Sequence, residues 1–333
     1  MIRGQRVELD VTGAAPPGVC TLVADVFAGD DVAPDTCAAI VVCLPGGGMA
    51  RGYFDLDVEG ETGTFSMARA LAAEGLVVVT LDLPGTGESD VPTDGYTLTP
   101  DAVADTVDRA TIGLVDAARA GELAPDVPAL PDVAVVGLGH SAGALIACYQ
   151  QARHRRYDAL ALLGFAGRGL VQHLTDEERA CIDDGHGLRE RLPQLVANRF
   201  GEPLPRSQTS GSDLLVRVPI SDAAREALLG CGTRLIGCVG LTSMVRGASA
   251  DELRAVDVPL FLGVGDADIT GPADRLPGDF PGARDLTLYV LAESGHNHNV
   301  APTRQLLWHR IASWIRSVAS VRGSRPAPRS RRS

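Results

Sequence analysis

One stretch governs how the chain must fold, and it reads Val135-Val136-Gly137-Leu138-Gly139-His140-Ser141-Ala142-Gly143-Ala144-Leu145-Ile146-Ala147. An apolar, β-branched run typical of a buried strand meets a Gly-x-Ser-x-Gly pentapeptide, and small and apolar residues typical of a helix follow. A strand that passes directly into a helix must turn sharply at Ser141. The glycines at 139 and 143 let the two elements approach closely, and the strained turn lifts the serine hydroxyl clear of the backbone. Ser141 is therefore the candidate nucleophile.

The same glycines allow a second interpretation, because Gly137-x-Gly139-x-x-x-Gly143 after a strand could form a dinucleotide-binding turn. Such a turn needs an acidic residue at the end of the next strand, about 20 residues on. The nearest candidate, Asp158, stands before the apolar run of residues 159–165 rather than after it. The spacing therefore favours the serine interpretation, and no cofactor is expected.

Length and composition narrow the class of protein. The chain has 333 residues, of which 45% are hydrophobic, and this suffices for one large α/β domain with an insertion or for two smaller domains. Its formal net charge of −12 argues against nucleic acid or an anionic membrane as the main partner. The sequence contains no lysine, which excludes a P-loop and Schiff-base chemistry.

The sequence also bears on the compartment. The first ten residues lack the apolar segment of a signal peptide, and no apolar run approaches the roughly 18 residues that a membrane-spanning helix needs. Seven cysteines without a Cys-x-x-Cys motif favour free thiols, with Cys231 and Cys238 as an alternative pair. Cys43 and Cys148 stand in apolar runs, where a buried and inert thiol is expected. We therefore expect a soluble, cytoplasmic protein.

The rest of the chain alternates buried strands with helical patterns, as expected for an α/β fold with a mostly parallel sheet covered by helices. The expected strands are residues 5–11, 20–27, 38–44, 76–81, 133–136, 159–165, 259–264 and 286–291, and the expected helices are residues 65–73, 100–120, 142–153 and 303–318. Between residues 167 and 255 the alternation stops, and a mixed, mostly helical stretch contains a capping box at Thr175-Asp176-Glu177-Glu178. We predict an α/β core of residues 1–166 and 256–320, an inserted segment of residues 167–255 and a disordered basic tail of residues 321–333.

A serine hydroxyl becomes nucleophilic only beside a base, and a third group must orient that base. His296 follows the last expected strand, and Asp268 follows the strand before it. Loops that follow parallel strands gather at one edge of the sheet, so both side chains are expected near the serine. His298 is the alternative base and Asp266 the alternative acid, although Asp266 is better placed to accept hydrogen bonds from loop amides. The order Ser, Asp, His is the one that belongs to this turn.

Two further loops accompany these residues. Leu44-Pro45-Gly46-Gly47-Gly48-Met49 follows a buried strand, and Asp82-Leu83-Pro84-Gly85-Thr86-Gly87-Glu88-Ser89-Asp90 follows the next strand in the chain. Together with the serine turn they resemble the α/β-hydrolase superfamily over about residues 38–166 and 256–318. The first loop is similar to the family's His-Gly-Gly-Gly oxyanion loop, with Pro45 where the histidine usually stands. The second is similar to the loop that these enzymes carry before the long helix.

The resemblance has two implications for the site. The oxyanion hole would be made by the backbone amides of Gly47, Gly48 and Ala142. Because the donors are backbone amides, the replacement of the family's usual histidine by Pro45 does not affect them. Residues 167–255 would form a helical cap that roofs the pocket and selects the substrate.

Three side chains near these loops are candidates for the substrate pocket: Met49, Tyr53 and His140. Structural roles are the alternative for Tyr53 and for His140, which stands beside the nucleophile. The pair His296-x-His298 suggests a metal, but no further His or Cys cluster completes a ligand set, so no metal is expected.

The sequence thus predicts a hydrolase that acts on ester bonds, a carboxylesterase or a lactonase, with a Ser141, His296 and Asp268 triad and a small-molecule substrate. An acyltransferase, a thioesterase or a carbon-carbon hydrolase with the same triad is the alternative, and a ligand-binding member of the fold without catalysis is the third hypothesis. The substrate and the choice between a monomer and a homodimer stay open at this point.

Overall fold

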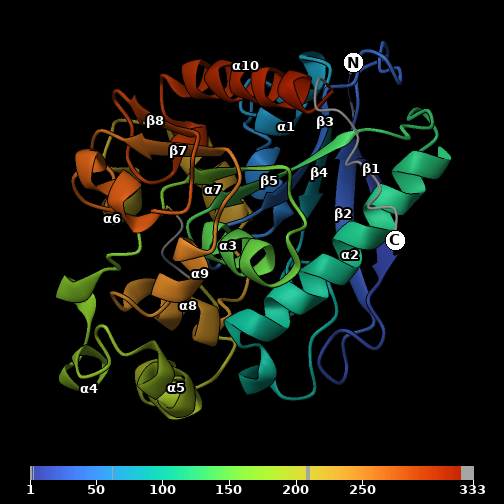
Figure 1. Ribbon diagram of the computed structural model, residues 1–333. Helices are drawn as coiled ribbons and strands as arrows, with labels where there is room; N and C mark the ends of the chain where they lie inside the picture. The colour runs from blue at the N-terminus through green and yellow to red at the C-terminus, as the bar shows by residue number, and fades with distance from the viewer. Residues whose placement is uncertain (1, 3, 62, 208–210, 324–333) are drawn as a thin grey trace.

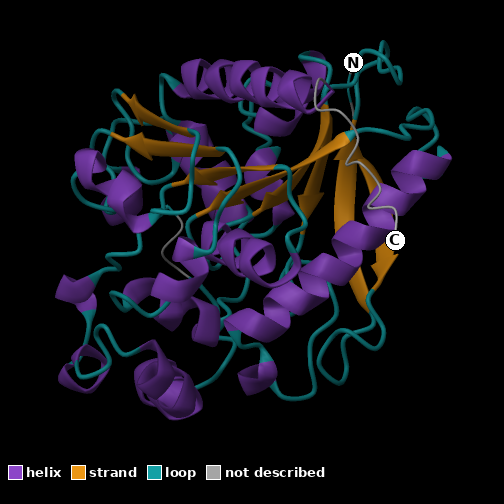
Figure 2. Ribbon diagram, viewed as in Figure 1, coloured by secondary structure: helices purple, strands orange, loops and turns teal. Residues whose placement is uncertain are grey.

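The computed structural model describes the chain except for residues 1, 3, 62, 208–210 and 324–333. Its centre is an eight-stranded sheet with the strand order β1-β2-β4-β3-β5-β6-β7-β8, seen twisting through the middle of Figure 1 and Figure 2. β2 pairs antiparallel with β1 and β4, and all other neighbours are parallel. The strands are β1 (Gln5–Asp10), β2 (Thr21–Phe27), β3 (Ala39–Leu44), β4 (Val77–Leu81), β5 (Ala134–His140), β6 (Ala159–Leu163), β7 (Leu260–Gly265) and β8 (Leu286–Leu291).

Helices cover both faces of this sheet (Figure 1). α2 (Pro100–Ala120) and α3 (Ala142–His154) contact each other and share one hydrophobic core with one face. α1 (Met67–Ala73) and α10 (Arg304–Gly323) contact each other and share a second core with the opposite face. Every residue of β3, β4, β5, β6 and β7 is buried, which explains why these strands read as unbroken apolar runs. The predicted fold class is therefore confirmed.

The long helix α2 shows how local signals set its ends. The side chain of Thr99 accepts a hydrogen bond from the amide of Ala102, and Pro100 occupies the first turn, where its missing N–H is not needed. The helix stops at Gly121, which adopts the left-handed conformation with φ of 75°. The predicted range of residues 100–120 matches the helix in the structure.

Two elements are longer than the sequence pattern predicts. β5 does not stop at Val136 but continues to His140, because Gly137 and Gly139 stay in register with β3 and β6. Glycine after an apolar run reads as a turn in the sequence, whereas here it remains in the ladder and carries the chain to the serine turn. α10 continues to Gly323, three residues into the segment predicted to be a disordered tail, and residues 324–333 of that prediction lie outside the described residues.

The chain between β6 and β7 is mostly helical and lies beside the carboxyl ends of the strands. Its α-helices are α4 (Asp176–Arg179), α5 (Gly185–Phe200), α6 (Asp213–Val216), α7 (Asp222–Gly230), α8 (Gly237–Met244) and α9 (Ala250–Arg254). α4 begins with the predicted capping box, in which Thr175 and Glu178 each bond the other's backbone N–H. Residues of α5 and α8 build a small hydrophobic core of their own.

The cysteines do not cross-link the fold. All seven are free, and Cys43 and Cys148 are buried, as predicted. Burial raises the pKa of both buried thiols far above the ordinary value, so they remain protonated and unreactive.

Candidate active site

Ser141 stands at the turn between β5 and α3. Its φ of 52° and ψ of −117° are a strained backbone conformation for Ser141, because residues other than glycine rarely adopt a positive φ. The amide of Ser141 donates to the carbonyl of Leu163 at the end of β6, which fixes the turn against the neighbouring strand. A Cβ atom at Gly143 would overlap the carbonyl oxygens of Leu44 and Pro45, so only glycine allows this close approach of helix and strand.

Asp268 and His296 meet at the same edge of the sheet. Asp268 lies in the loop after β7 and His296 in the loop after β8, and both are buried. The Nδ1–H of His296 donates to Oδ1 of Asp268 over 2.9 Å. Asp266 instead accepts the amides of Glu293 and Ser294 at 2.9 and 3.0 Å, which is the loop-forming role considered for it. The structure therefore brings Asp268, and not Asp266, to the histidine.

The same carboxylate holds a second histidine. Nε2 of His298 lies 3.1 Å from Oδ2 of Asp268, and this side chain is buried. Burial alone would raise the pKa of Asp268, but the charge of His296 and the hydrogen bonds from both histidines outweigh it and hold the pKa well below its ordinary value. The sequence offered His296 and His298 as alternatives, whereas the structure uses one carboxylate for both.

His296 lies against the serine turn. Its ring contacts Gly164, where an added Cβ would lie 3.0 Å from Cε1 and from Nδ1 of His296, and Gly164 directly follows the residue that receives the amide of Ser141. His140, which precedes Ser141, has its ring centroid 4.8 Å from that of His296. The Nε2–H of His140 donates to the backbone oxygen of His296 over 2.9 Å. The serine turn and the histidine loop are thus joined directly.

His140 and Tyr53 pack next to the pair of Asp268 and His296. Both are buried, and their rings stack with centroids 4.7 Å apart. Burial lowers the pKa of His140 well below its ordinary value, and the charges of His296 and His298 lower it further, so the ring stays neutral. Both residues were candidates for the substrate pocket, and in the structure His140 contacts His296 while Tyr53 stacks on His140.

The glycine loop after β3 lies beside the start of α3. A Cβ at Gly47 would lie 3.6 Å from Cβ of Ala142, and Gly48 has a φ of 77°. An added Cβ at Gly48 would overlap the side chain of Ser207, which belongs to the segment between β6 and β7. The loop therefore lies between the start of α3 and that segment, with Gly47 next to Ala142.

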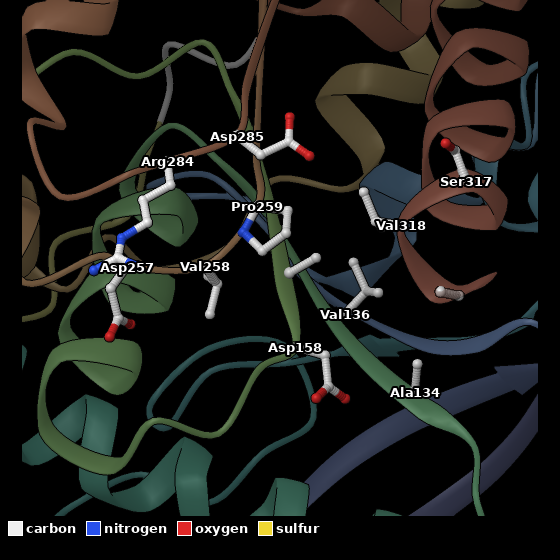
Figure 3. Close-up of a pocket in the computed structure, with 12 residues that line it drawn as sticks. Ala134, Val136, Asp158, Asp257, Val258, Pro259, Arg284, Asp285, Ser317 and Val318 are labelled. Atoms are coloured by element: carbon white, nitrogen blue, oxygen red, sulfur yellow. The ribbon is translucent and has the colours of Figure 1, made fainter. Parts of the chain in front are cut away.

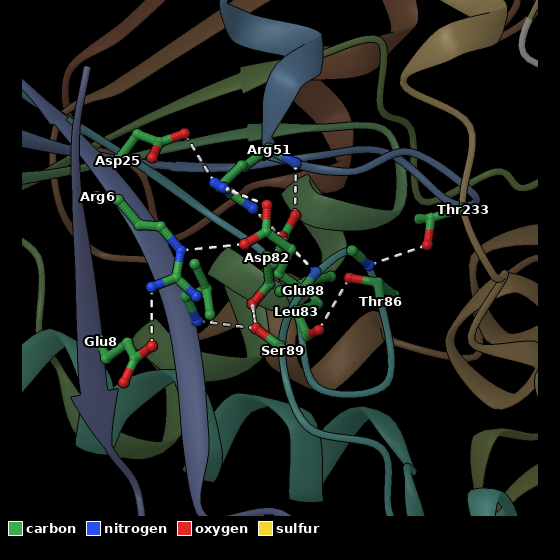
Figure 4. A network of polar contacts seen from close by, with 12 residues as sticks. Arg6, Glu8, Asp25, Arg51, Asp82, Leu83, Thr86, Glu88, Ser89 and Thr233 are labelled. Carbon is green, nitrogen blue, oxygen red and sulfur yellow. Dashed lines mark hydrogen bonds and ion pairs between the residues drawn. The ribbon is translucent and has the colours of Figure 1, made fainter.

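A partly buried ion-pair network surrounds Arg51, which follows the glycine loop (Figure 4). Asp82, fully buried, accepts the backbone N–H and the guanidinium of Arg51. The other guanidinium nitrogens of Arg51 donate to Asp25 at 2.7 Å and to Glu88 at 2.9 Å. Asp90 accepts the amides of Cys20 and Thr21. The acidic residues of the second loop therefore hold neighbouring loops in place, and no pattern in the sequence predicted the partners of Arg51.

A small cavity lies between the glycine loop and the helical segment. Its volume is about 10 Å³, which is room for one water molecule at most. The residues that line it are Gly46, Gly47, Gly48, Met49, Leu83, Thr86, Ala142, Arg234, Leu235, Ile236 and Val239. Met49 lines this cavity, and its role in a substrate pocket stays a prediction; the last four residues carried no signal in the sequence.

The model of the alpha/beta hydrolase family matches residues 41–307, which is most of the chain and includes every residue of the triad candidates. The chain belongs to the alpha/beta hydrolase family. Among curated proteins, no sequence matches that of this hydrolase at a significant level.

Solved structures similar to this hydrolase share its fold. One is an esterase from Thermogutta terrifontis, with 19% identity, 95% of this chain and 99% of that chain covered and a TM-score of 0.56. Another is a thioesterase domain from the curacin biosynthetic pathway, with 18% identity, the same coverage and a TM-score of 0.58. A third is a monoacylglycerol lipase from Paleococcus ferrophilus, with 16% identity, the same coverage and a TM-score of 0.59. At these identities the likeness shows the fold alone.

The described residues offer neither a metal-binding cluster nor a membrane-spanning helix. Within the described residues, no three or more His, Cys, Asp or Glu side chains are grouped so that they could hold a metal ion. None of the described helices has the length and apolar character needed to cross a membrane.

Proposed function

We propose that this alpha/beta hydrolase cleaves a carboxylic ester through an acyl-enzyme, with Ser141 as nucleophile, His296 as base and Asp268 as the acid that orients the base. The observation that carries the proposal is the hydrogen bond between Asp268 and His296 beside the strained turn that presents Ser141. A lactone is an internal ester and is open to the same chemistry.

In this proposal each proton has a defined place. Asp268 accepts Nδ1–H of His296 and so fixes the tautomer in which Nε2 carries the lone pair. Nε2 takes the proton of the Ser141 hydroxyl as its oxygen attacks the ester carbonyl, and then returns that proton to the leaving alcohol. A water molecule, deprotonated by the same nitrogen, releases the acid and restores the serine.

The oxyanion that forms during each step needs preorganised donors. The amides of Gly47, Gly48 and Ala142 are the proposed donors, because the first and last of these residues are neighbours across the turn. One such donor is typically worth about 3 kcal/mol of barrier. The Arg51 and Asp82 network holds the glycine loop in position for this role.

The helical segment acts as a cap in this proposal. Residues 167–255 cover a core made of residues 1–166 and 256–320, and the cap supplies Leu235, Ile236 and Val239 to the wall of the cavity. A volume of about 10 Å³ is too small for any ester, so the cap must move to admit substrate. Met49 is the predicted pocket residue that contacts the substrate, while Tyr53 and His140 support the base.

The decisive variant is Ser141→Ala. We expect turnover of 4-nitrophenyl butyrate to fall by roughly 10³-fold or more, since the nucleophile is lost. The matched control is Ser317→Ala, which removes an exposed hydroxyl of α10 at the other edge of the sheet. Wild type and control should also be labelled by a fluorophosphonate, and Ser141→Ala should not. Full activity of Ser141→Ala, with an unchanged melting temperature, would refute the proposal.

The same acyl-enzyme can transfer its acyl group to other acceptors. A thioesterase domain is among the similar structures, so thioesters belong in the assay beside oxygen esters. Product analysis in the presence of a competing alcohol separates hydrolysis from acyl transfer, and a β-diketone substrate tests cleavage of a carbon-carbon bond. A protein that binds ligand without catalysis would show no fluorophosphonate label.

A further inference from the structure

Two arginines face each other at the mouth of the proposed active site. Arg206 and Arg234 are partners in an isolated antiparallel bridge, and both are exposed. Directly opposed residues of an antiparallel pair project to the same side, with Cβ atoms about 5 Å apart, where like charges repel. Within the described part of the chain neither arginine has an ion pair, although the chain has 42 acidic residues. Among the described residues, no acidic side chain therefore offsets the repulsion between the two guanidinium groups.

This pair is fastened to the loops of the site. The amide of Thr233 donates to the carbonyl of Gly48 over 2.8 Å, and the amide of Ala50 donates to the carbonyl of Cys231 over 2.9 Å. The hydroxyl of Thr233 accepts the amide of Gly87 over 2.9 Å (Figure 4). Arg234 follows Thr233 directly, so its backbone is held at a fixed place relative to the glycine loop.

A cavity opens between the two arginines. It has a volume of about 340 Å³ and is lined by Arg206, Arg234, Thr233, Cys231 and backbone of four small residues, with no carboxylate in its wall. Arg234 also lines the cavity of about 10 Å³ beside Ala142. It therefore stands where the outer, positively charged cavity meets the inner, mostly apolar one.

We infer that Arg206 and Arg234 form an anion subsite, and that the substrate is an ester that carries a carboxylate or phosphate group. The inference rests on the proposed function, because it places the reacting carbonyl at the glycine loop and the anionic group in the outer cavity. Two guanidinium groups without a protein acid present planar sets of donors that match the oxygens of such a group. A chain with a net charge of −12 repels anions, so a local pair of cations is needed to recruit one.

The test compares two matched pairs of esters on the full-length protein. Mono-4-nitrophenyl glutarate and 4-nitrophenyl valerate have acyl chains of equal length and differ in the terminal carboxylate. Likewise, 4-acetoxybenzoate and phenyl acetate differ by a carboxylate in the alcohol part. The quantity measured is the ratio of kcat/KM for the anionic ester to that for the neutral ester.

We expect this ratio to fall about tenfold in Arg206→Gln and in Arg234→Gln for at least one pair, as is typical when a charge-assisted hydrogen bond is lost. Arg284→Gln is the control, because it removes an equal charge from an exposed arginine at the opposite edge of the sheet (Figure 3). Its ratio should stay within twofold of wild type. Inhibition by inorganic phosphate and by glutarate, measured in the same variants, shows which oxyanion the subsite prefers.

Two results would overturn the inference. One is an unchanged ratio for both pairs in both variants, and the other is an equal fall in Arg284→Gln, which would indicate the overall charge of the protein instead of a subsite. Binding of the glutarate ester to Ser141→Ala by calorimetry needs no turnover. Loss of that binding on adding Arg234→Gln would support the subsite even if wild type cleaved no ester, so failure of the subsite and failure of the proposed reaction give different results.

Discussion

The cavity at the amino edge of the sheet and the one beside the serine turn differ greatly in size, although the carboxyl edge also holds the outer cavity of about 340 Å³. At the amino ends of β5, β6, β7 and β8 lies a cavity of about 480 Å³, drawn in Figure 3, whereas the one at the carboxyl ends beside Ala142 measures about 10 Å³. Asp158, Asp257, Arg284 and Asp285 surround the larger cavity. Asp257 pairs with Arg155 at 2.8 Å, and Asp158 accepts the amide of Val135 at 2.9 Å, so both act within the fold.

We nevertheless propose that the smaller cavity belongs to the active site. Of the two edges, within the described residues, it is the carboxyl edge that brings together a strained serine, a buried carboxylate with a strongly lowered pKa and a buried neutral histidine. A large volume marks where a ligand has room, but strained backbone and buried charge mark where chemistry can happen. The comparison teaches that cavity volume alone is a poor guide to where a candidate active site lies.

The largest expected effect comes from replacing Asp268 at the carboxyl edge. Asp268→Asn should lower kcat by roughly 10³-fold to 10⁴-fold, because the amide no longer holds the His296 tautomer. His298 offers no substitute, since it bonds the same carboxylate. Asp266→Asn is the matched control in the same loop and should change kcat only a few-fold. Equal losses in the two variants, measured with one ester, would remove Asp268 from the triad.

A smaller effect concerns stability and pH. Burial, with the charges of His296 and His298, lowers the pKa of His140, while the His296 carbonyl and Asp268 oppose this only in part. The unfolded chain binds a proton at this histidine below about pH 6.5, whereas the folded chain does not. Folding stability should therefore fall as the pH drops below 6.5, by up to about 1.4 kcal/mol per pH unit from this group.

Urea unfolding at pH 7.5, 6.5 and 5.5 checks this expectation. His140→Gln, which keeps an N–H donor near the carbonyl of His296, should show a shallower loss of unfolding free energy on acidification. His309→Gln removes an exposed histidine of α10 and should follow wild type. Parallel pH profiles for all three proteins would show that His140 is not the group that titrates.

The smallest expected effect concerns a substitution at the amino edge of the sheet. Val318→Phe adds bulk to the wall of the cavity of about 480 Å³, far from the serine turn. We expect kcat and KM for 4-nitrophenyl butyrate to stay within twofold of wild type, since no group at that edge takes part in the reaction. A tenfold loss of activity in a variant of normal melting temperature would show that the amino edge contributes to function.

Much of the fold could be predicted because its signals are local. Continuous apolar runs predict β3 to β7, and capping residues predict the ends of α2, each within a few residues. The loops that follow parallel strands gather at the carboxyl ends of those strands, which places them at one edge. The serine turn was visible in five residues for the same reason. Local periodicity therefore gave the sheet, its helices and the region of the candidate site.

The rest depends on contacts between distant residues, which one sequence does not display. Asp268 accepts both histidines because two loops fold onto each other, and the spacing His-x-His alone offered only a choice between them. The bridge between Arg206 and Arg234 joins positions that no periodic pattern connects. The closure of the inner cavity by Leu235 and Ile236 likewise follows from packing between segments.

The small volume of the inner cavity has a kinetic consequence for the proposed reaction. If residues 167–255 form a movable cap, as proposed, a ligand finds little space beside Ala142, and productive encounter waits for the fraction of molecules in which the helices between β6 and β7 have moved aside. The observed association rate is then the collision rate multiplied by that fraction, well under the diffusion limit. Thr233→Val removes the hydroxyl that accepts the amide of Gly87, and we expect it to quicken entry of the ligand.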